Sequence, residues 1–291
     1  MVNMDRKLFH INKAMVHFLC KHGILPAIKK VDDRIAAAEN RLGNRLIQLQ
    51  AGLEAEFIRE LRRRGRLPVN ANEQKGLLSQ IFDTPFESMI SAVADGGLEG
   101  AEIGRQLTFE DLAEQGLNIA FESFSESVRE ELRTKIYEFS QDTFSRIRGD
   151  FQDTLAKAYE EGVGIDEVAE RLRKDFQGLR EHRLKNIART EIQGAQNEGS
   201  HQTMIDMGVT YKQWLTVGDD RVRGNDPKDE YDHTALHGEV VRLDEAFSNG
   251  LMYPGDRSGP IGEWINCRCR ERPYIPKRGE IIITTPYYPA A

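Results

Sequence analysis

The chain has 291 residues, of which 30% are charged and 39% hydrophobic, and its formal net charge is −7. The length suits one large or two medium domains, and the acidic balance excludes a protein that binds nucleic acids over its whole surface. We expect no membrane partner, since no apolar run approaches the roughly 20 residues of a transmembrane helix, and residues 1–10 lack a signal peptide's apolar core. Three cysteines, with Cys20 far from the other two, favour a reducing cytoplasm over a disulfide framework.

The N-terminal part predicts a basic arm followed by helices. Residues 1–30 carry six lysines and arginines against one aspartate, a local charge of +5. This arm is suited to contact DNA or an acidic protein surface, although a solvated helix is the more ordinary interpretation. Over residues 31–64 apolar side chains recur at intervals of three, four and seven, which predicts a helix that packs against another helix of the chain or of a partner. A second helix is expected from about 73 to 94, ending at the glycines 96 and 97.

The middle of the chain predicts further helices separated by glycines. Thr108, with an acidic residue three positions later, has the pattern of a helix N-cap. The long helical region that follows, residues 109–162, is expected to break near Gly116. Gly162 and Gly164 then interrupt the pattern.

The last helices lead into a different kind of sequence. A short helix is expected over 165–176 and a longer one over 180–207, with Gly208 as its C-cap. Residues 210–217 have the composition and alternation of a strand. Glycine, proline and aspartate are dense beyond it, apart from a short helix expected over 244–247.

These patterns predict an α+β fold, in which a long helical N-terminal two-thirds precedes a small mixed α/β C-terminal module with short antiparallel strands. We expect four consecutive segments. They are an N-terminal helical region with the basic arm (1–110), a long-helix bundle or stalk (111–179), the module (180–275) and a C-terminal tail (276–291). The tail is β-prone and suits either a strand of its own module or a strand added to a neighbour's sheet.

Two polar clusters stand out at the start of the module. Thr190, Asn197 and His201 share one stripe of a helix, because seven residues are nearly two turns, and they are suited to a buried hydrogen-bond network. The turn around Asp220 predicts a hairpin in which Arg221 and Arg223 share a face. Arginines of this kind pair with carboxylates or bind phosphates.

Histidines and cysteines form a third group. Cys267 and Cys269 are expected to share one face of a strand, since side chains alternate along a strand. With His233 and His237 they have the composition of a zinc site, but a single residue between two cysteines is an unusual spacing. The alternative interpretation is that both thiols are small buried hydrophobic groups and that no cofactor is bound.

Catalysis has weaker support in the sequence. His233 is placed to act as a base for a nucleophilic cysteine, and Asp220, Asp232, His233 and His237 are residue types used by metal-dependent nucleases or transferases. Neither pattern comes with a second diagnostic motif such as a phosphate-binding glycine loop. We therefore expect a protein that is not an enzyme.

Taken in chain order, these motifs resemble the phage Mu F-like minor head protein domain of tailed bacteriophages, over about residues 150–275. The residues that carry the resemblance are Arg189, Thr190, Glu191, Asn197, Trp214, Asp220, Arg221, Arg223, His233, Gly238, Asp256, Asn266, Cys267 and Cys269. We expect them mostly to determine the fold. Many members have aspartate where this chain has His237, so the resemblance does not extend to a zinc site with four ligands.

The resemblance implies a low-copy protein of the capsid interior near the portal, present in the host cytoplasm during assembly. The implied partners are the portal protein and the major capsid protein, and the implied roles are head assembly and DNA packaging. Contact with packaged DNA through the basic arm and a homo-oligomer through the helical region are further expectations. The alternatives are a metal-dependent nuclease or transferase and a DNA-binding accessory protein that acts through the arm.

Overall fold

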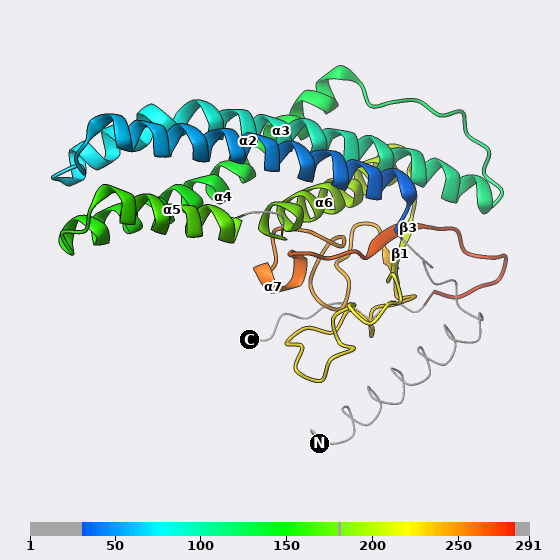
Figure 1. The fold of residues 1–291 in the computed structure, drawn as a ribbon. Helices are drawn as coiled ribbons and strands as arrows, with labels where there is room; N and C mark the ends of the chain where they lie inside the picture. Colours follow the sequence, from blue (N-terminus) through cyan, green and yellow to red (C-terminus); the bar gives the residue numbers. More distant parts are fainter. Residues whose placement is uncertain (1–30, 180–181, 283–291) are drawn as a thin grey trace. The chain divides into compact units, whose positions relative to one another are not determined.

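The computed structural model describes residues 31–179 and 182–282 (Figure 1). The basic arm at 1–30, Cys20 and residues 283–291 of the tail lie outside the described residues. The described elements, in chain order, are α2 (Asp33–Arg64), α3 (Ala71–Glu114), α4 (Glu126–Glu160), α5 (Ile165–Leu179), α6 (His182–Asp206), β1 (Tyr211–Leu215), β2 (Val240–Arg242), α7 (Ile261–Trp264) and β3 (Arg270–Tyr274). Long helices followed by a small antiparallel sheet confirm the predicted α+β fold.

The chain forms two compact units. The helical unit comprises Ala37–Leu98 and Glu126–Glu191, and the sheet unit comprises the described residues of Met1–Ala36, Glu99–Ser125 and Ile192–Ala291. Helices α2, α3 and α6 each contribute residues to both units. The four consecutive segments expected from the sequence stay a prediction.

Aromatic side chains form the core of the helical unit. The rings of Phe57 and Phe82 lie 5.1 Å apart edge to face, and those of Phe151 and Phe176 lie 4.4 Å apart. Such ring pairs add stability beyond the apolar area that they bury. Leu46 and Leu61 of the predicted α2 stripe are also fully buried. The stripe is therefore covered within the helical unit itself.

Helix α3 is longer than the sequence indicates. It runs without a break from Ala71 to Glu114, so the prediction that a helix ends at residues 96 and 97 was wrong. The predicted N-cap at Thr108 was also wrong, because its hydroxyl donates to the carbonyl of Gly104 one turn earlier, at 3.0 Å. This bond is typical of a threonine inside a helix.

Close packing explains why glycines sit inside α3. Within the sheet unit, a Cβ at Gly100 would lie 2.8 Å from the carbonyl oxygen of Ile192 on α6. A Cβ at Gly104 would overlap the carbonyl oxygen of Gln196, and one at Gly199 would overlap that of Ala101. Glycine allows backbones to approach this closely. These glycines therefore bring α3 and α6 together and do not end a helix.

Other glycines end helices as predicted. Gly116, Gly162 and Gly208 have φ angles of 90°, 67° and 65°, which lie in the left-handed region that favours glycine. Gly208 follows the last turn of α6 and donates to the carbonyl of Ile205 at 3.0 Å. Among helices in the described ranges, none combines the length and apolar character that a membrane crossing needs.

The sheet has the strand order β2-β1-β3 with antiparallel pairing. The central strand β1 confirms the strand predicted over 210–217. In the register, Trp214 lies opposite Glu271 and Lys212 lies opposite both Val241 and Pro273.

Three local predictions in the module were wrong. The predicted hairpin around 219–223 is a series of turns, and residues 244–247 form no helix. The segment 265–269 is not a strand, because Asn266 has a φ of 55° and the amide of Cys267 bonds back to the carbonyl of Trp264. The strand begins only at Arg270, where pairing with β1 starts.

We predict opposite effects for two glycine substitutions in α3. Gly104→Ala should lower the free energy of unfolding by about 1–3 kcal/mol, because its Cβ has no space against α6. Gly76→Ala should raise it by about 0.5–1 kcal/mol, because no atom lies within 4 Å of that Cβ and alanine favours helix. Urea unfolding of both variants measures the difference. Equal effects would contradict the close packing of α3 and α6.

Candidate functional site

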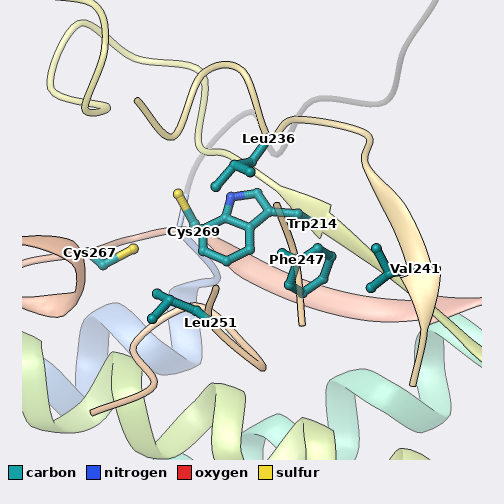
Figure 2. Close-up of a cluster of buried hydrophobic side chains, with 7 residues drawn as sticks. All are labelled: Trp214, Leu236, Val241, Phe247, Leu251, Cys267 and Cys269. Atoms are coloured by element: carbon teal, nitrogen blue, oxygen red, sulfur yellow. The ribbon is translucent and has the colours of Figure 1, made fainter. Parts of the chain in front are cut away.

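The predicted site residues of the module meet around the Trp214 side chain. Its ring is fully buried and packs edge to face on Phe247, with ring centroids 5.1 Å apart. Figure 2 shows the ring between the two cysteines on one side and Phe247 and Val241 on the other. Trp214 also contacts the His233 ring edge to face, at 5.3 Å. The tryptophan therefore forms one wall of the site.

Three of the four predicted metal ligands come together. The Sγ atoms of Cys267 and Cys269 lie 3.6 and 3.7 Å from Nδ1 of His233. The ligand atoms of these three residues all lie within 4.8 Å of one another, and all three residues are buried. His237 is not part of this group among the described residues, since its Nδ1 accepts hydrogen bonds from the Thr216 amide at 3.0 Å and the Thr216 hydroxyl at 2.9 Å.

Short-range contacts fix the His233 ring. Its Nε2 lies 2.6 Å from a carboxylate oxygen of Glu263, which belongs to the short helix α7. An ionised carboxylate only accepts hydrogen bonds, so Nε2 carries the hydrogen of this pair. In the neutral ring Nδ1 then holds the lone pair, and it is Nδ1 that faces the sulfur atoms.

Burial and these contacts shift the pKa values of His233, Cys267 and Cys269. Burial alone lowers the pKa of His233, but hydrogen bonds with Cys267 and Glu263 outweigh it and raise that pKa to about 9. Hydrogen bonding from Cys269 holds the pKa of Cys267 well below its usual range, whereas burial raises that of Cys269. Of the two thiols, Cys267 is therefore the more acidic.

A small cavity adjoins the three residues. It has a volume of about 10 Å³ and is also lined by Arg221, Arg223 and Asn266. A volume of this size corresponds to about one water-sized sphere. A substrate as large as a nucleotide does not fit into this cavity.

Arginines hold the loops around the cavity. Arg268 donates two hydrogen bonds to the carboxylate of Asp219, at 2.5 and 2.6 Å, and this pairing lowers the pKa of Asp219. Arg223 donates to the carbonyl of Ile265. The expected arginine–carboxylate pairing thus occurs at Asp219, which also lies 3.8 Å from the exposed Arg221, whereas Asp220 is exposed.

The polar residues of α6 divide between the two units. In the helical unit Arg189 pairs with Glu39 at 3.4 Å, and Thr190 and Glu191 are buried. In the sheet unit Asn197 donates to the carbonyl of Cys269 at 2.9 Å. The side-chain oxygen of Asn197 accepts from the amide of Glu271 at 3.0 Å.

A glutamine that the sequence did not single out repeats this arrangement. Gln115 donates to the carbonyl of Pro273 at 2.9 Å and accepts from the amide of Ile275 at 2.9 Å. Residues 269, 271, 273 and 275 point their backbone groups to one edge of β3, because successive residues alternate. Two side-chain amides therefore cover the edge of β3 that does not pair with β1.

Two buried charged residues, Lys212 and Glu271, lie on the sheet beside Trp214. Lys212 is fully buried, donates to the carbonyl of Met252 at 2.6 Å and lies over the Phe247 ring. Burial lowers its pKa to about 8. Glu271 is also fully buried and lies 3.1 Å from His201. No sequence pattern marked Lys212, because an alternating strand gives no sign that a lysine faces inward.

The two remaining motif residues shape loops. Gly238 has a φ of 84° and donates to the carbonyl of Trp214 at 2.8 Å. The carboxylate of Asp256 accepts from the amides of Met252 and Ser258, both at 2.9 Å. Both residues therefore act by fixing the backbone.

We predict that Asn197→Ala lowers the free energy of unfolding by about 2–5 kcal/mol, since it leaves two backbone groups in a buried place without partners. Asn186→Ala, also on α6, is the matched control, because its amide lies on the surface 3.1 Å from His182. Its effect should stay within about 0.5 kcal/mol. Chemical denaturation compares the two, and similar losses would contradict the role of Asn197.

We predict a pH-dependent stability difference between the wild type and Lys212→Met. The pKa of Lys212 falls from 10.5 to about 8 on folding, so between these values the unfolded chain binds more protons. The free energy of unfolding of the wild type, relative to the variant, should therefore rise with pH across that window, by on the order of 3 kcal/mol. Denaturation curves between pH 7 and pH 10 measure it, and a flat difference would contradict the burial of a charged lysine.

Comparison with known proteins gives one match. Residues 149–272 match the family described as Phage Mu protein F like protein. This range agrees with the resemblance found over about residues 150–275, and it runs from α4 to β3. No curated protein and no solved structure matches the chain.

Proposed function

We propose, from the match of residues 149–272 to the family described as Phage Mu protein F like protein, that this chain is a phage head morphogenesis protein and acts as a minor head protein at the portal vertex. In this role it binds the portal protein and the major capsid protein inside the capsid. It enters the head during assembly in the host cytoplasm and supports DNA packaging. The family match is the observation that carries the proposal.

The arrangement of the motif residues supports a structural role. Asn197, Gly238 and Asp256 bond to backbone groups, and Arg268 bonds to a neighbouring loop. Residues used in this way hold a fold together. The cavity beside His233 has room for about one water molecule, which also favours a protein that binds other head components over an enzyme.

The partners follow from the same premise. A minor head protein must recognise the portal or the major capsid protein, because it has to enter the particle in a defined place. The basic arm at 1–30 is the segment that we assign to contact with packaged DNA, on its charge alone. Since the apolar stripe of α2 is buried within the helical unit, a homo-oligomer would have to use another surface.

We predict that the protein enters heads only when the portal is present. The full chain is expressed together with the portal and major capsid proteins of the same phage genome, and the particles are isolated by sedimentation. Mass spectrometry should find the protein in these particles at far fewer copies than the major capsid protein. Particles assembled without the portal protein are the control and should lack it.

Two results would contradict this proposal. Absence of the protein from particles that contain the portal would exclude a head component. Its presence in equal amount with and without the portal would show that it binds the major capsid protein alone.

A further inference from the structure

The distances between His233 and the two cysteines match those of a metal site. In a tetrahedral zinc site with bonds of about 2.1 Å to nitrogen and 2.3 Å to sulfur, nitrogen and sulfur stand roughly 3.6 Å apart. The observed separations of Nδ1 from the two sulfur atoms are 3.6 and 3.7 Å. One ion at the centre of this group would therefore reach all three ligands without a change of the backbone.

The contacts of His233 also suit a metal ligand. Histidines that bind metals usually donate their other ring nitrogen to a carboxylate, which fixes the ring and its tautomer. Glu263 supplies this carboxylate at 2.6 Å from Nε2, and Asn249 donates to the same carboxylate oxygen at 3.2 Å. The lone pair of Nδ1 is thereby directed at the position between the sulfur atoms.

The chemical type of the three ligands favours one kind of metal ion. Two thiolates and an imidazole favour Zn²⁺ over hard cations such as Mg²⁺ and Ca²⁺, which prefer oxygen. The cysteines bind the ion as thiolates and the histidine as a neutral ring, any protons they carry leave to the solvent, and two thiolates balance the charge of Zn²⁺. A buried site then holds no net charge among its ligands and metal, which lowers the cost of burial.

The spacing of the cysteines is compatible with this site because of the local fold. Asn266 turns the chain with its φ of 55°, and Arg268 between the cysteines points to Asp219. Both sulfur atoms therefore face His233. The sequence alone argues against zinc because a single intervening residue is uncommon.

We propose that His233, Cys267 and Cys269 bind one Zn²⁺ ion, with water as the fourth ligand in the adjoining cavity. The cavity lined by Arg221, Arg223 and Asn266 has the volume of about one water molecule. The ion joins the loop that follows β1 to the segment that precedes β3. It holds together the part of the module in which regular secondary structure is sparse, and this function is independent of the binding of the portal.

The test uses the full chain under reducing conditions. Bound metal is removed with a chelator, and Co²⁺ is then added in steps as a probe for zinc. The wild type should bind one equivalent of Co²⁺ and show a thiolate-to-cobalt charge-transfer band in the near ultraviolet. One equivalent of Zn²⁺ should abolish this band, and the untreated protein should contain one zinc per chain by elemental analysis.

Variants test the ligand set. His233→Gln and Cys269→Ser should lose the band, whereas Glu263→Gln should weaken the affinity for Co²⁺ by roughly 10- to 100-fold, as expected of a group that orients a ligand. His237→Asn keeps an acceptor for Thr216 and should bind like the wild type. Cys20→Ser is the matched control for a cysteine outside the site and should also bind normally.

Clear results would overturn the proposal. One is a folded and reduced wild type that shows no charge-transfer band and contains no zinc. The other is a His233→Gln variant that binds Co²⁺ as tightly as the wild type. If a ligand variant fails to fold by circular dichroism, the spectrum of the wild type and the retained binding of His237→Asn decide the matter.

Discussion

The free edge of β3 is the constraint on which the sheet unit depends. An edge strand exposes backbone groups that must find partners when they are buried. Here the amides of Asn197 and Gln115 supply them, each bonding a carbonyl and the amide two residues on. Pro273 has no amide hydrogen to donate. Its backbone faces this edge of β3, so the missing hydrogen costs no bond to β1. Helix α6 and the turn that follows α3 thus cover the outer edge of the three-stranded sheet in the described residues.

The same bonds position the cysteines. Because Asn197 holds the carbonyl of Cys269, the segment before β3 has a fixed place, and its sulfur atoms face His233. A helix motif and a cysteine motif that are distant in sequence are therefore parts of one structure. This shows how short motifs scattered along residues 149–272, the range of the family match, belong to one arrangement of contacts. The motifs mark the residues at which distant segments bond to one another.

Periodicity and residue type predicted correctly those helices, strands and helix ends that are determined by residues close together along the chain. The stripe of α2, the strand β1 and the breaks at Gly116, Gly162 and Gly208 follow from periodicity and backbone preference. Gly97 misled because it accommodates a neighbouring helix, which a single sequence does not show: a Cβ there would lie 2.8 Å from the side chain of Ile136 on α4. For the site, composition identified His233 and the cysteines. Glu263 and Gln115 gave no sequence signal, because their roles arise only from long-range contacts.

Backbone amide hydrogen exchange of the full chain tests most directly whether side-chain amides close the edge of β3. The amides of Glu271 and Ile275 bond only to side chains in this account. They should nevertheless exchange as slowly as the amide of Trp214, which bonds to the carbonyl of Glu239. Replacing Asn197 should then release Glu271 selectively. Rapid exchange at both positions in the wild type, at the rate of exposed loops, would contradict the account.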